Sequence, residues 1–336
     1  TEIYTEDDSF TIKKSKIRGE VSQGMICAED ELGLGESHDG IMVLPADAQV
    51  GQAAAEYFNI ESDFVFEIGL TPNRTDAMSH YGVARDLRAA ILRYEGGNLA
   101  LTLPTLTPLS NSSEDLPIKI SIKNSEACYR YSGLALKNVQ VKTSPETGHP
   151  LHAFDAAKIS GAEINVQNAE EGQVFTTLDG SELKLSNKDL MICDAEKPLV
   201  LAGVYGGLNS GVSQETTSVF LEAAYFNSVS VRKSAKRHGL NTDSSFRYER
   251  GVDPEMTLFA LKRAASLMIE LAGAELGMNI KDEHPHTIEA TQVVLDLNRM
   301  NTLIGHSIEP DLVRSILHSL DIRILSESHQ KLNLEI

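Results

Sequence analysis

The chain has 336 residues, of which 41% are hydrophobic and 23% are charged, and its formal net charge is −18. This length allows more than one buried core, since domains usually hold roughly 100–200 residues, and the lack of any run of about 18 apolar residues argues against a membrane span. The acidic balance argues against a general affinity for nucleic acid, because phosphate binding depends on Lys and Arg.

The first part of the chain predicts small all-β structure over residues 1–57. Short apolar runs at residues 10–13 and 25–28 are separated by glycine-containing turns, a pattern typical of short strands. The polar, acidic first residues do not resemble a signal peptide. Strand-like patterns at both ends, including residues 332–336, indicate that the chain is a fragment of a longer protein.

Residues 58–100 predict a small α/β unit. The apolar run at residues 64–68 predicts a strand. A helix is expected to begin near Asp76 or Ser79, because apolar side chains then recur at helical spacing until the glycines at 96 and 97.

The largest unit is expected over residues 116–285, after a linker rich in proline, threonine and serine at residues 102–115. An Asp-Gly pair at residues 179–180 predicts a hairpin with a two-residue turn. A long helix is expected to begin at the Asp-Pro pair at 253–254 and to end at Gly273. Alternating or apolar runs predict strands at residues 118–122, 199–204 and 219–223.

The last unit is expected over residues 288–336. It begins with a predicted strand at residues 293–295, which is followed by a short helix ending at Gly305 and a second helix from Pro310. The three cysteines of the whole chain lie far apart and form no CxxC pair, which favours a reducing, cytosolic setting.

The first candidate for chemistry is the run HPLHAFD at residues 149–155. His149 and His152 lie three residues apart and Asp155 follows, so the group can bind a metal, or act as a base with its orienting partner, or be a histidine pair held by backbone bonds. The spacing alone leaves all three interpretations open. A metal site would need further ligands, and the sequence places no other Cys or His suitably.

Two more candidates lie on predicted strands. Gly206 and Gly207 follow a buried strand, where paired glycines either admit a ligand close to the backbone or simply form a tight turn. Without a GxGxxG or Walker-type pattern, a nucleotide-phosphate loop is not supported. Glu222 is the only charged residue in an apolar strand, so it either faces solvent or lies in a cleft with partners, because a desolvated carboxylate is costly.

The stretch from His238 to Asp253 is dense in hydroxyl, amide and charged groups just before a helix, as is typical of loops that bind polar ligands. It contains no GxSxG motif of a serine hydrolase. A local basic cluster overlaps this stretch in an otherwise acidic chain, and it predicts either a local binding site or a solvated helix face. Its members are Arg232, Lys233, Lys236, Arg237, Arg247 and Arg250.

Several of these motifs occur together and in the order found in one known family. HPLHAFD at 149–155, LAGVYGGLNSGV at 201–212 and RHGLNTDSSFRYERGVDP at 237–254 resemble the editing domain of the bacterial phenylalanyl-tRNA synthetase β subunit. Residues 14–35 resemble the tRNA-binding OB-type domain of that subunit, and residues 66–87 resemble its neighbouring α/β domain.

The resemblance implies an α+β fold in four parts. These are a partial OB-type β-barrel at residues 1–57, part of a small α/β domain at 58–100, a large mixed α/β editing domain at 116–285, and the truncated start of a small α/β domain at 288–336. It also implies a cytoplasmic enzyme whose β subunit pairs with a catalytic α subunit in an (αβ)2 tetramer and binds tRNA(Phe). The whole enzyme would use ATP and Mg²⁺ for charging, but nothing in this chain matches those sites.

In that family, this region hydrolyses tyrosyl-tRNA made in error. By resemblance, Glu222 matches the glutamate that receives the tyrosine hydroxyl, and His152 matches the histidine near the scissile ester. Gly206 matches a glycine of the pocket wall, next to Gly207, and Thr242 matches a threonine near the terminal adenosine.

The remaining assignments concern the rest of the pocket and the tRNA. Asn241 and Ser244 are candidate substrate contacts, and Ser244 stands where many members have alanine. Residues 142–147 replace a longer stretch that helps to form the pocket in the family. The cations expected to hold the acceptor end of the tRNA are Lys233, Lys236, Arg237, Arg247 and Arg250.

The mechanism expected from these residues is ester hydrolysis by a positioned water without a covalent intermediate, because no activated Ser or Cys motif is present. His152 would orient or deprotonate the water, and backbone N–H groups near Gly206 would stabilise the oxyanion. Two other classes remain open: a non-catalytic scaffold that binds tRNA and the α subunit, and a His/Asp metallohydrolase.

Overall fold

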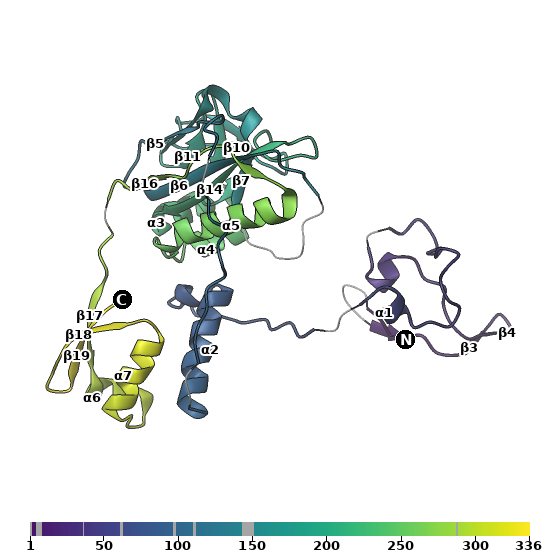
Figure 1. The fold of residues 1–336 in the computed structure, drawn as a ribbon, viewed down its shortest axis with the longest axis horizontal. Coiled ribbons are helices and arrows are strands. Elements are labelled where there is room, and N and C mark those ends of the chain that lie inside the picture. Colours follow the sequence, from purple (N-terminus) through teal and green to yellow (C-terminus); the bar gives the residue numbers. More distant parts are fainter. Residues whose placement is uncertain are drawn as a thin grey trace. The chain divides into compact units, whose positions relative to one another are not determined.

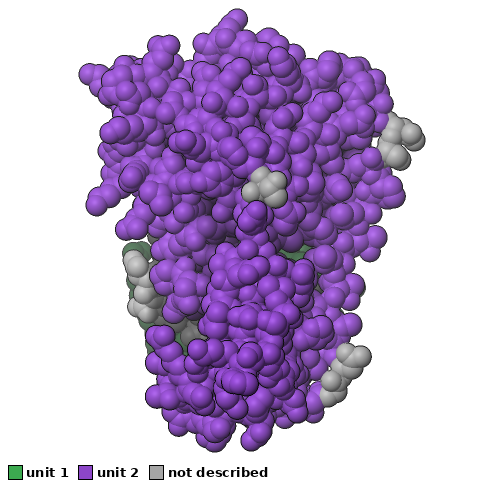
Figure 2. Space-filling model, turned by 90° about the vertical axis from the view of Figure 1, so that its left-hand side faces the viewer, with its two compact units in different colours: residues 1–68 green, residues 69–336 purple. Residues whose placement is uncertain are grey.

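The computed structural model describes residues 2–4, 9–35, 37–60, 63–96, 99–109, 112–142, 151–286 and 288–336 (Figure 1). The chain divides into two compact units, residues 1–68 and residues 69–336 (Figure 2). The fold is of the mixed α/β kind, with several separate sheets and no closed barrel in these ranges. No helix in the described part of the chain is long and apolar enough to cross a membrane.

The first unit contains two antiparallel ladders, β1 with β2 and β3 with β4. In the turn between β3 and β4, Arg18 and Gly19 both have positive φ angles (52° and 94°), as a tight hairpin turn requires. The strand predicted at residues 25–28 is wrong, because these residues join no ladder. The elements of this unit are β1 (Glu2–Tyr4), β2 (Ser9–Thr11), β3 (Ser15–Ile17), β4 (Glu20–Ser22), η1 (Asp30–Leu32) and α1 (Ala54–Tyr57).

The strand predicted at residues 64–68 is also wrong. These residues belong to no strand, and the side chains of Phe64, Val65 and Phe66 are more than four-fifths exposed. An apolar run favours a strand only where a neighbouring strand accepts its backbone hydrogen bonds, and none of the described strands does so here.

The second unit begins with η2 (Thr75–Ala77) and α2 (His80–Tyr94). The predicted helix start is confirmed, because the Ser79 side chain caps α2 and accepts a hydrogen bond from the N–H of Gly82 at 3.0 Å. Arg74 holds this turn to the helix through ion pairs with Asp76 (3.0 Å) and Asp86 (2.7 Å).

The described residues between 112 and 286 contain two large sheets and one two-stranded hairpin. One large sheet has the order β15-β6-β14-β7, with β16 also paired to β6, and the other has the order β13-β12-β11-β8-β5, in which β5 and β8 run parallel. The strands are β5 (Lys119–Ile122), β6 (Cys128–Lys137), β7 (His152–Asp155), β8 (Glu163–Asn168), β11 (Leu190–Cys193), β12 (Pro198–Leu201), β13 (Tyr205–Gly206), β14 (Ser218–Phe226), β15 (Glu275–Leu276) and β16 (Lys281–Glu283).

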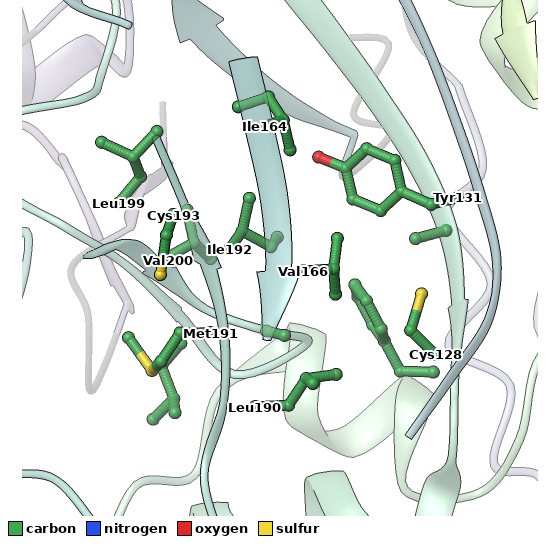
Figure 3. Packing of buried hydrophobic residues seen from close by; sticks show 14 of the residues in the cluster. Cys128, Tyr131, Ile164, Val166, Leu190, Met191, Ile192, Cys193, Leu199 and Val200 are labelled. Carbon is green, nitrogen blue, oxygen red and sulfur yellow. The ribbon is translucent and has the colours of Figure 1, made fainter. Parts of the chain in front are cut away.

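The central strand β14 supplies side chains to two cores on its opposite faces. Leu221 and its alternate neighbours pack against α5, where Leu261 is fully buried. Phe220 and its alternate neighbours face the second sheet and share a core with Ile164 and Val166 of β8. Figure 3 shows side chains of β6, β8, β11 and β12 meeting in this second core. Glu222 lies on the same face of β14 as Phe220, since residues two apart on a strand point the same way.

The helices of this region are α3 (Ser228–His238), α4 (Asp243–Tyr248) and α5 (Met256–Ala272). The start predicted for the long helix is two residues too early. Asp253 instead accepts a hydrogen bond from the N–H of Glu255 at 2.9 Å, and α5 begins at the next residue. The predicted end at Gly273 is confirmed by its left-handed φ of 64°.

The predicted hairpin is confirmed as β9 (Val174–Thr176) and β10 (Glu182–Lys184). The short helices η3 (Ala156–Lys158) and η4 (Ser160–Ala162) precede β8 in the chain. The predicted two-residue turn of the hairpin is wrong, because its strands are joined by residues 177–181. The Asp179 carboxylate closes this longer loop by accepting hydrogen bonds from the Thr177 hydroxyl (2.5 Å) and the Ser181 N–H (3.1 Å).

Residues 288–336 fold into a three-stranded antiparallel sheet of order β17-β19-β18 with two helices. The predicted helix end at Gly305 and the start at Pro310 are both confirmed. The elements are β17 (Gln292–Asp296), α6 (Leu297–Ile304), α7 (Pro310–Ser319), β18 (Arg323–Ser328) and β19 (Lys331–Glu335).

Candidate functional site

The carboxyl of Glu222 and the imidazole of His152 lie on neighbouring strands. Glu222 is directly opposite His152 in the antiparallel pairing of β14 with β7. Cross-strand partners project from the same face of a sheet, with Cβ atoms about 4.5–5.5 Å apart. Glu222 is only 5% exposed, so the strand pairing places it in the interior instead of in solvent.

Glu222 has one side-chain partner among the described residues, the phenol of Tyr131 on β6. The Tyr131 hydroxyl donates to Glu222 Oε2 at 2.8 Å. Burial raises the pKa of Glu222 to about 8, and the hydrogen bond from Tyr131 opposes this rise. Near pH 7 most molecules therefore carry a neutral carboxyl, and the rest carry a carboxylate whose charge is stabilised by one phenol.

His152 is neutral and carries an unpartnered nitrogen. Burial lowers the pKa of His152 to about 4, and its Nε2 atom is buried with no hydrogen-bond partner among the residues that the structure describes. The ring packs on Phe154, with centroids 4.4 Å apart. A base with so low a pKa removes a proton weakly at pH 7, so this geometry favours orienting a water over deprotonating it completely.

Gly206, which ends β13, and Gly207, which follows it, have different roles. A Cβ on Gly206 would lie 3.2 Å from Cε1 of His152, so this glycine leaves room beside the imidazole. A Cβ on Gly207 would lie 2.5 Å from the carbonyl oxygen of Leu199, and its N–H already donates to that oxygen at 2.9 Å. The N–H of Gly207 is therefore engaged in the sheet, which leaves it no free hydrogen for an oxyanion. A cavity beside Gly207 includes neither Glu222 nor His152.

Thr242 and Ser244 attach the start of α4 to the turn that precedes β13. The Thr242 hydroxyl donates to the carbonyl of Val204 at 2.8 Å and accepts from the N–H of Ser245 at 3.0 Å. The Ser244 hydroxyl donates to the carbonyl of Gly203 at 3.0 Å. Both hydroxyls thus hold the wall of the site in place.

The other end of α4 is attached to the strand that carries Glu222. The Tyr248 hydroxyl donates to the carbonyl of Ala224 at 3.2 Å, and the Tyr248 ring packs on Phe226 with centroids 5.2 Å apart. The remaining candidate of this loop, Asn241, is exposed. The motif at residues 237–254 therefore connects both sheets next to the carboxyl.

The predicted tRNA-binding cations differ in their surroundings. Lys233 and Lys236 are exposed on α3, and Arg247 is exposed on α4. Arg237 forms an ion pair with Asp189, and Arg250 pairs with Glu249 at 2.7 Å. Arg237 and Arg250 would have to give up intramolecular ion-pair partners to bind a phosphate, and Arg247 would have to give up its hydrogen bond to the Met78 carbonyl.

Sequence reasoning missed Tyr131 and Asp189. Tyr131 lies in a buried strand where only its contact with Glu222 distinguishes it. Asp189 is fully buried and binds Ser234, Arg237 and His238 of α3. The one available signal was that an interior carboxylate needs partners, which predicts that such partners exist but not which residues they are.

The first histidine of the HPLHAFD run, His149, lies outside the described residues, as do residues 143–148, which include most of the shortened stretch. Within the described ranges, no cluster of three or more His, Cys, Asp or Glu side chains is arranged to hold a metal ion.

Comparison with known proteins covers the whole chain. Residues 138–273 match the B3/4 domain family, and residues 9–53 match the tRNA binding domain family. All of the chain aligns at 47% identity with phenylalanine–tRNA ligase β subunits from Bacteroides fragilis and Porphyromonas gingivalis, covering 44% of each. The chain belongs to the phenylalanine–tRNA ligase β-subunit family.

More distant members of the family align in the same way. The β subunit of Bdellovibrio bacteriovorus is 42% identical over 90% of the chain and 40% of its own length. The chain thus spans less than half the length of the β subunits it matches. A crystal structure of an N-terminal fragment of the phenylalanyl-tRNA synthetase β subunit from Pyrococcus horikoshii covers 79% of this chain and 78% of its own, with 14% identity and a TM-score of 0.36.

Proposed function

We propose that this chain is the part of a phenylalanine–tRNA ligase β subunit that hydrolyses tyrosyl-tRNA(Phe). The observation that carries the proposal is the nearly complete burial of Glu222 opposite His152. An interior carboxyl can hydrogen-bond a phenolic hydroxyl, whereas a phenylalanyl ring would leave the carboxyl without that bond. A site of this kind favours hydrolysis of tyrosyl-tRNA(Phe), the mischarged product, over hydrolysis of phenylalanyl-tRNA(Phe), the correct one.

Such a second site is needed because of the limits of apolar recognition. A pocket shaped for phenylalanine rejects an added hydroxyl by only about 10²-fold, whereas a site that hydrogen-bonds the hydroxyl discriminates by about 10⁴-fold or more. Glu222 would supply this bond, and Gly206, Gly207, Asn241 and Ser244 would form the surrounding wall. Thr242 would act beside the terminal adenosine while it holds α4.

In the proposed reaction, a water molecule attacks the ester carbonyl carbon. The unpartnered Nε2 of His152 accepts a hydrogen bond from this water in the tautomer that carries its proton on Nδ1. The bond between the carbonyl carbon and the ribose oxygen then breaks, and the proton lost by the water passes to that oxygen. The products are free tyrosine and uncharged tRNA, and the chain itself is not modified.

The further proposals concern the whole protein. By its similarity to β subunits, we propose that it pairs with an α subunit in an (αβ)2 tetramer in the cytoplasm and supports the charging of tRNA(Phe) with ATP and Mg²⁺ bound elsewhere. The four-part division at residues 1–57, 58–100, 116–285 and 288–336, with an OB-type first part, belongs to the same proposal. The match of residues 9–53 to a tRNA binding domain family supports the first part.

The competing proposal, a non-catalytic scaffold, predicts a different outcome for a double variant. In the full-length protein with its α subunit, His152→Ala combined with Glu222→Ala is expected to lower the rate of tyrosyl-tRNA(Phe) deacylation by about 10²-fold or more, since positioning and acid–base groups contribute about that much. Release of labelled tyrosine measures the rate. An unchanged rate in a folded double variant would favour the scaffold.

The two exposed lysines of α3 supply a test of tRNA contact. Lys233→Ala with Lys236→Ala is expected to weaken tRNA(Phe) binding and to reduce the slope of log affinity against log salt concentration by about two, because each lysine releases about one counterion. Filter binding at several salt concentrations measures this slope. Lys184→Ala with Lys188→Ala is the matched control, since both are also exposed. Equal slopes in the two pairs would exclude α3 as a phosphate contact.

A further inference from the structure

Tyr131 is held in one place by the core between the two sheets. It is fully buried, and it is opposite Ala224 in the pairing of β6 with β14, two residues beyond Glu222 on the same face of β14. In Figure 3 its ring lies beside Ile164 of β8, in the same core as Cys128 and Val166. Because the ring is enclosed by packed strands, the direction of its hydroxyl is fixed by the fold and not by a loop.

The hydroxyl of Tyr131 uses one of the two oxygens of the neighbouring carboxyl. It donates to Glu222 Oε2 at 2.8 Å. A carboxyl group rotates readily about its last side-chain bond, and a fixed donor on one oxygen restricts that rotation. The second oxygen, Oε1, is then presented in a defined direction.

We propose that Tyr131 is the positioning residue for Glu222: its phenol fixes the carboxyl so that Oε1 receives the hydroxyl of the tyrosyl ester. This inference rests on the proposed editing function. The carboxylate would hold two phenols at once, one from the protein and one from the substrate. Tyr131 also stabilises the ionised carboxyl, because a hydrogen bond to the charged form favours that form.

The other titratable groups around the carboxyl do not change charge near neutral pH. Burial raises the pKa of Cys128 on β6 and of Tyr248 on α4, and the charge of Glu222 raises both further. Burial lowers the pKa of His152 on β7 to about 4. Among these groups and Tyr131, whose pKa is also raised by burial, Glu222 is the one that titrates near pH 8. A change in pH dependence between pH 6 and pH 9 therefore reports on Glu222.

The test is the variant Tyr131→Phe in the full-length protein with its α subunit. The measured quantity is the ratio of kcat/KM for deacylation of tyrosyl- and phenylalanyl-tRNA(Phe), with the spontaneous hydrolysis subtracted at each pH. The ratio is expected to rise with pH as the carboxyl ionises, because a charged acceptor binds a phenol more strongly. In Tyr131→Phe the ratio is expected to fall about ten-fold at pH 7, and the midpoint of its rise to move up by about one pH unit.

Tyr129→Phe is the matched control. Tyr129 lies on the same strand, and its hydroxyl accepts a hydrogen bond from the Asn227 amide at 2.8 Å, away from the carboxyl. Its variant is expected to leave the midpoint unchanged. If Tyr131→Phe does not fold, Tyr131→3-fluorotyrosine keeps the hydroxyl and makes it a stronger donor, so the midpoint is expected to move down instead.

The outcomes separate the two proposals. If the wild-type protein shows no preference for tyrosyl-tRNA(Phe), or Glu222→Ala keeps it, the proposed function fails. If Glu222→Ala removes the preference but Tyr131→Phe changes neither the ratio nor the midpoint, the role of Tyr131 is overturned and the proposed function stands.

Discussion

Glu222→Ala is expected to lower the preference for tyrosyl- over phenylalanyl-tRNA(Phe) by about 10²-fold or more. The carboxyl is the proposed partner of the substrate hydroxyl, and a site that has lost this partner distinguishes the two rings only by the small difference in their size. The loss is expected in the rate for the tyrosyl ester, since the phenylalanyl ester makes no bond to Glu222. Deacylation of both charged tRNAs by the full-length protein with its α subunit gives the ratio.

Glu222→Gln is the matched control for this variant. An amide keeps the shape and one hydrogen-bonding oxygen but cannot ionise, so it is expected to retain an intermediate preference that does not change between pH 6 and pH 9. A full preference in the alanine variant would refute the assigned role of Glu222, whatever the behaviour of the glutamine variant.

Asp189→Ala is expected to reduce the free energy of unfolding by about 3–5 kcal/mol, because it leaves the Ser234 hydroxyl, the His238 ring and the Ser186 N–H without their acceptor, and each buried donor left unpaired costs about 1–3 kcal/mol. Asp189 is fully buried, with the Ser234 hydroxyl at 2.6 Å and His238 Nε2 at 2.8 Å. Burial alone would raise the pKa of Asp189, but hydrogen bonds from Ser234, the Ser186 N–H and His238 hold it below its usual value. The charged form is therefore the one that the fold stabilises.

Urea unfolding of the chain measures this loss, with the slope of the transition compared between variants. Arg237→Ala is the informative control, because Arg237 is one of the partners of Asp189 and about a third exposed. It is expected to cost less than Asp189→Ala, since solvent screens its ion pair. A loss below about 1 kcal/mol for Asp189→Ala would show that α3 is held by other contacts. Because Arg237→Ala also destabilises the fold, any weakening of tRNA binding in this variant must be corrected for the unfolded fraction.

Local signals in the sequence predicted many of the elements. Ser79, Gly273, Gly305 and Pro310 mark helix ends in the structure because capping and helix-stopping depend on residues within one turn of each other. Local reasoning failed at Asp253, whose side chain forms a turn of its own before the helix begins. An N-cap residue followed by proline predicts a helix nearby but not its first residue.

The candidate site depended on information that no short window contains. The strand pattern around Glu222 left open whether it faced solvent, and only the pairing of β14 with β7 places His152 opposite it. Tyr131 is 91 residues from Glu222 along the chain, and nothing in its own surroundings marks it as a partner of a carboxyl. Which strands pair, and in which register, is decided by the whole core.

The different roles of the cations in the basic cluster also could not be predicted from the sequence. As residue types, all of its members were equal candidates for binding phosphate. In the structure Arg237 pairs with a buried carboxylate, whereas Lys233 and Lys236 extend from the exposed face of α3. A charge count cannot separate these roles, because the partner of Arg237 is 48 residues away.

The most direct measurement is a crystal structure of the chain soaked with tyrosine, with phenylalanine as the paired soak. We expect the phenolic oxygen of tyrosine within hydrogen-bond distance of Glu222 and its carboxyl group near His152, and no ordered phenylalanine at the same concentration. Tyrosine bound away from Glu222, or phenylalanine bound equally well in the same place, would contradict the account.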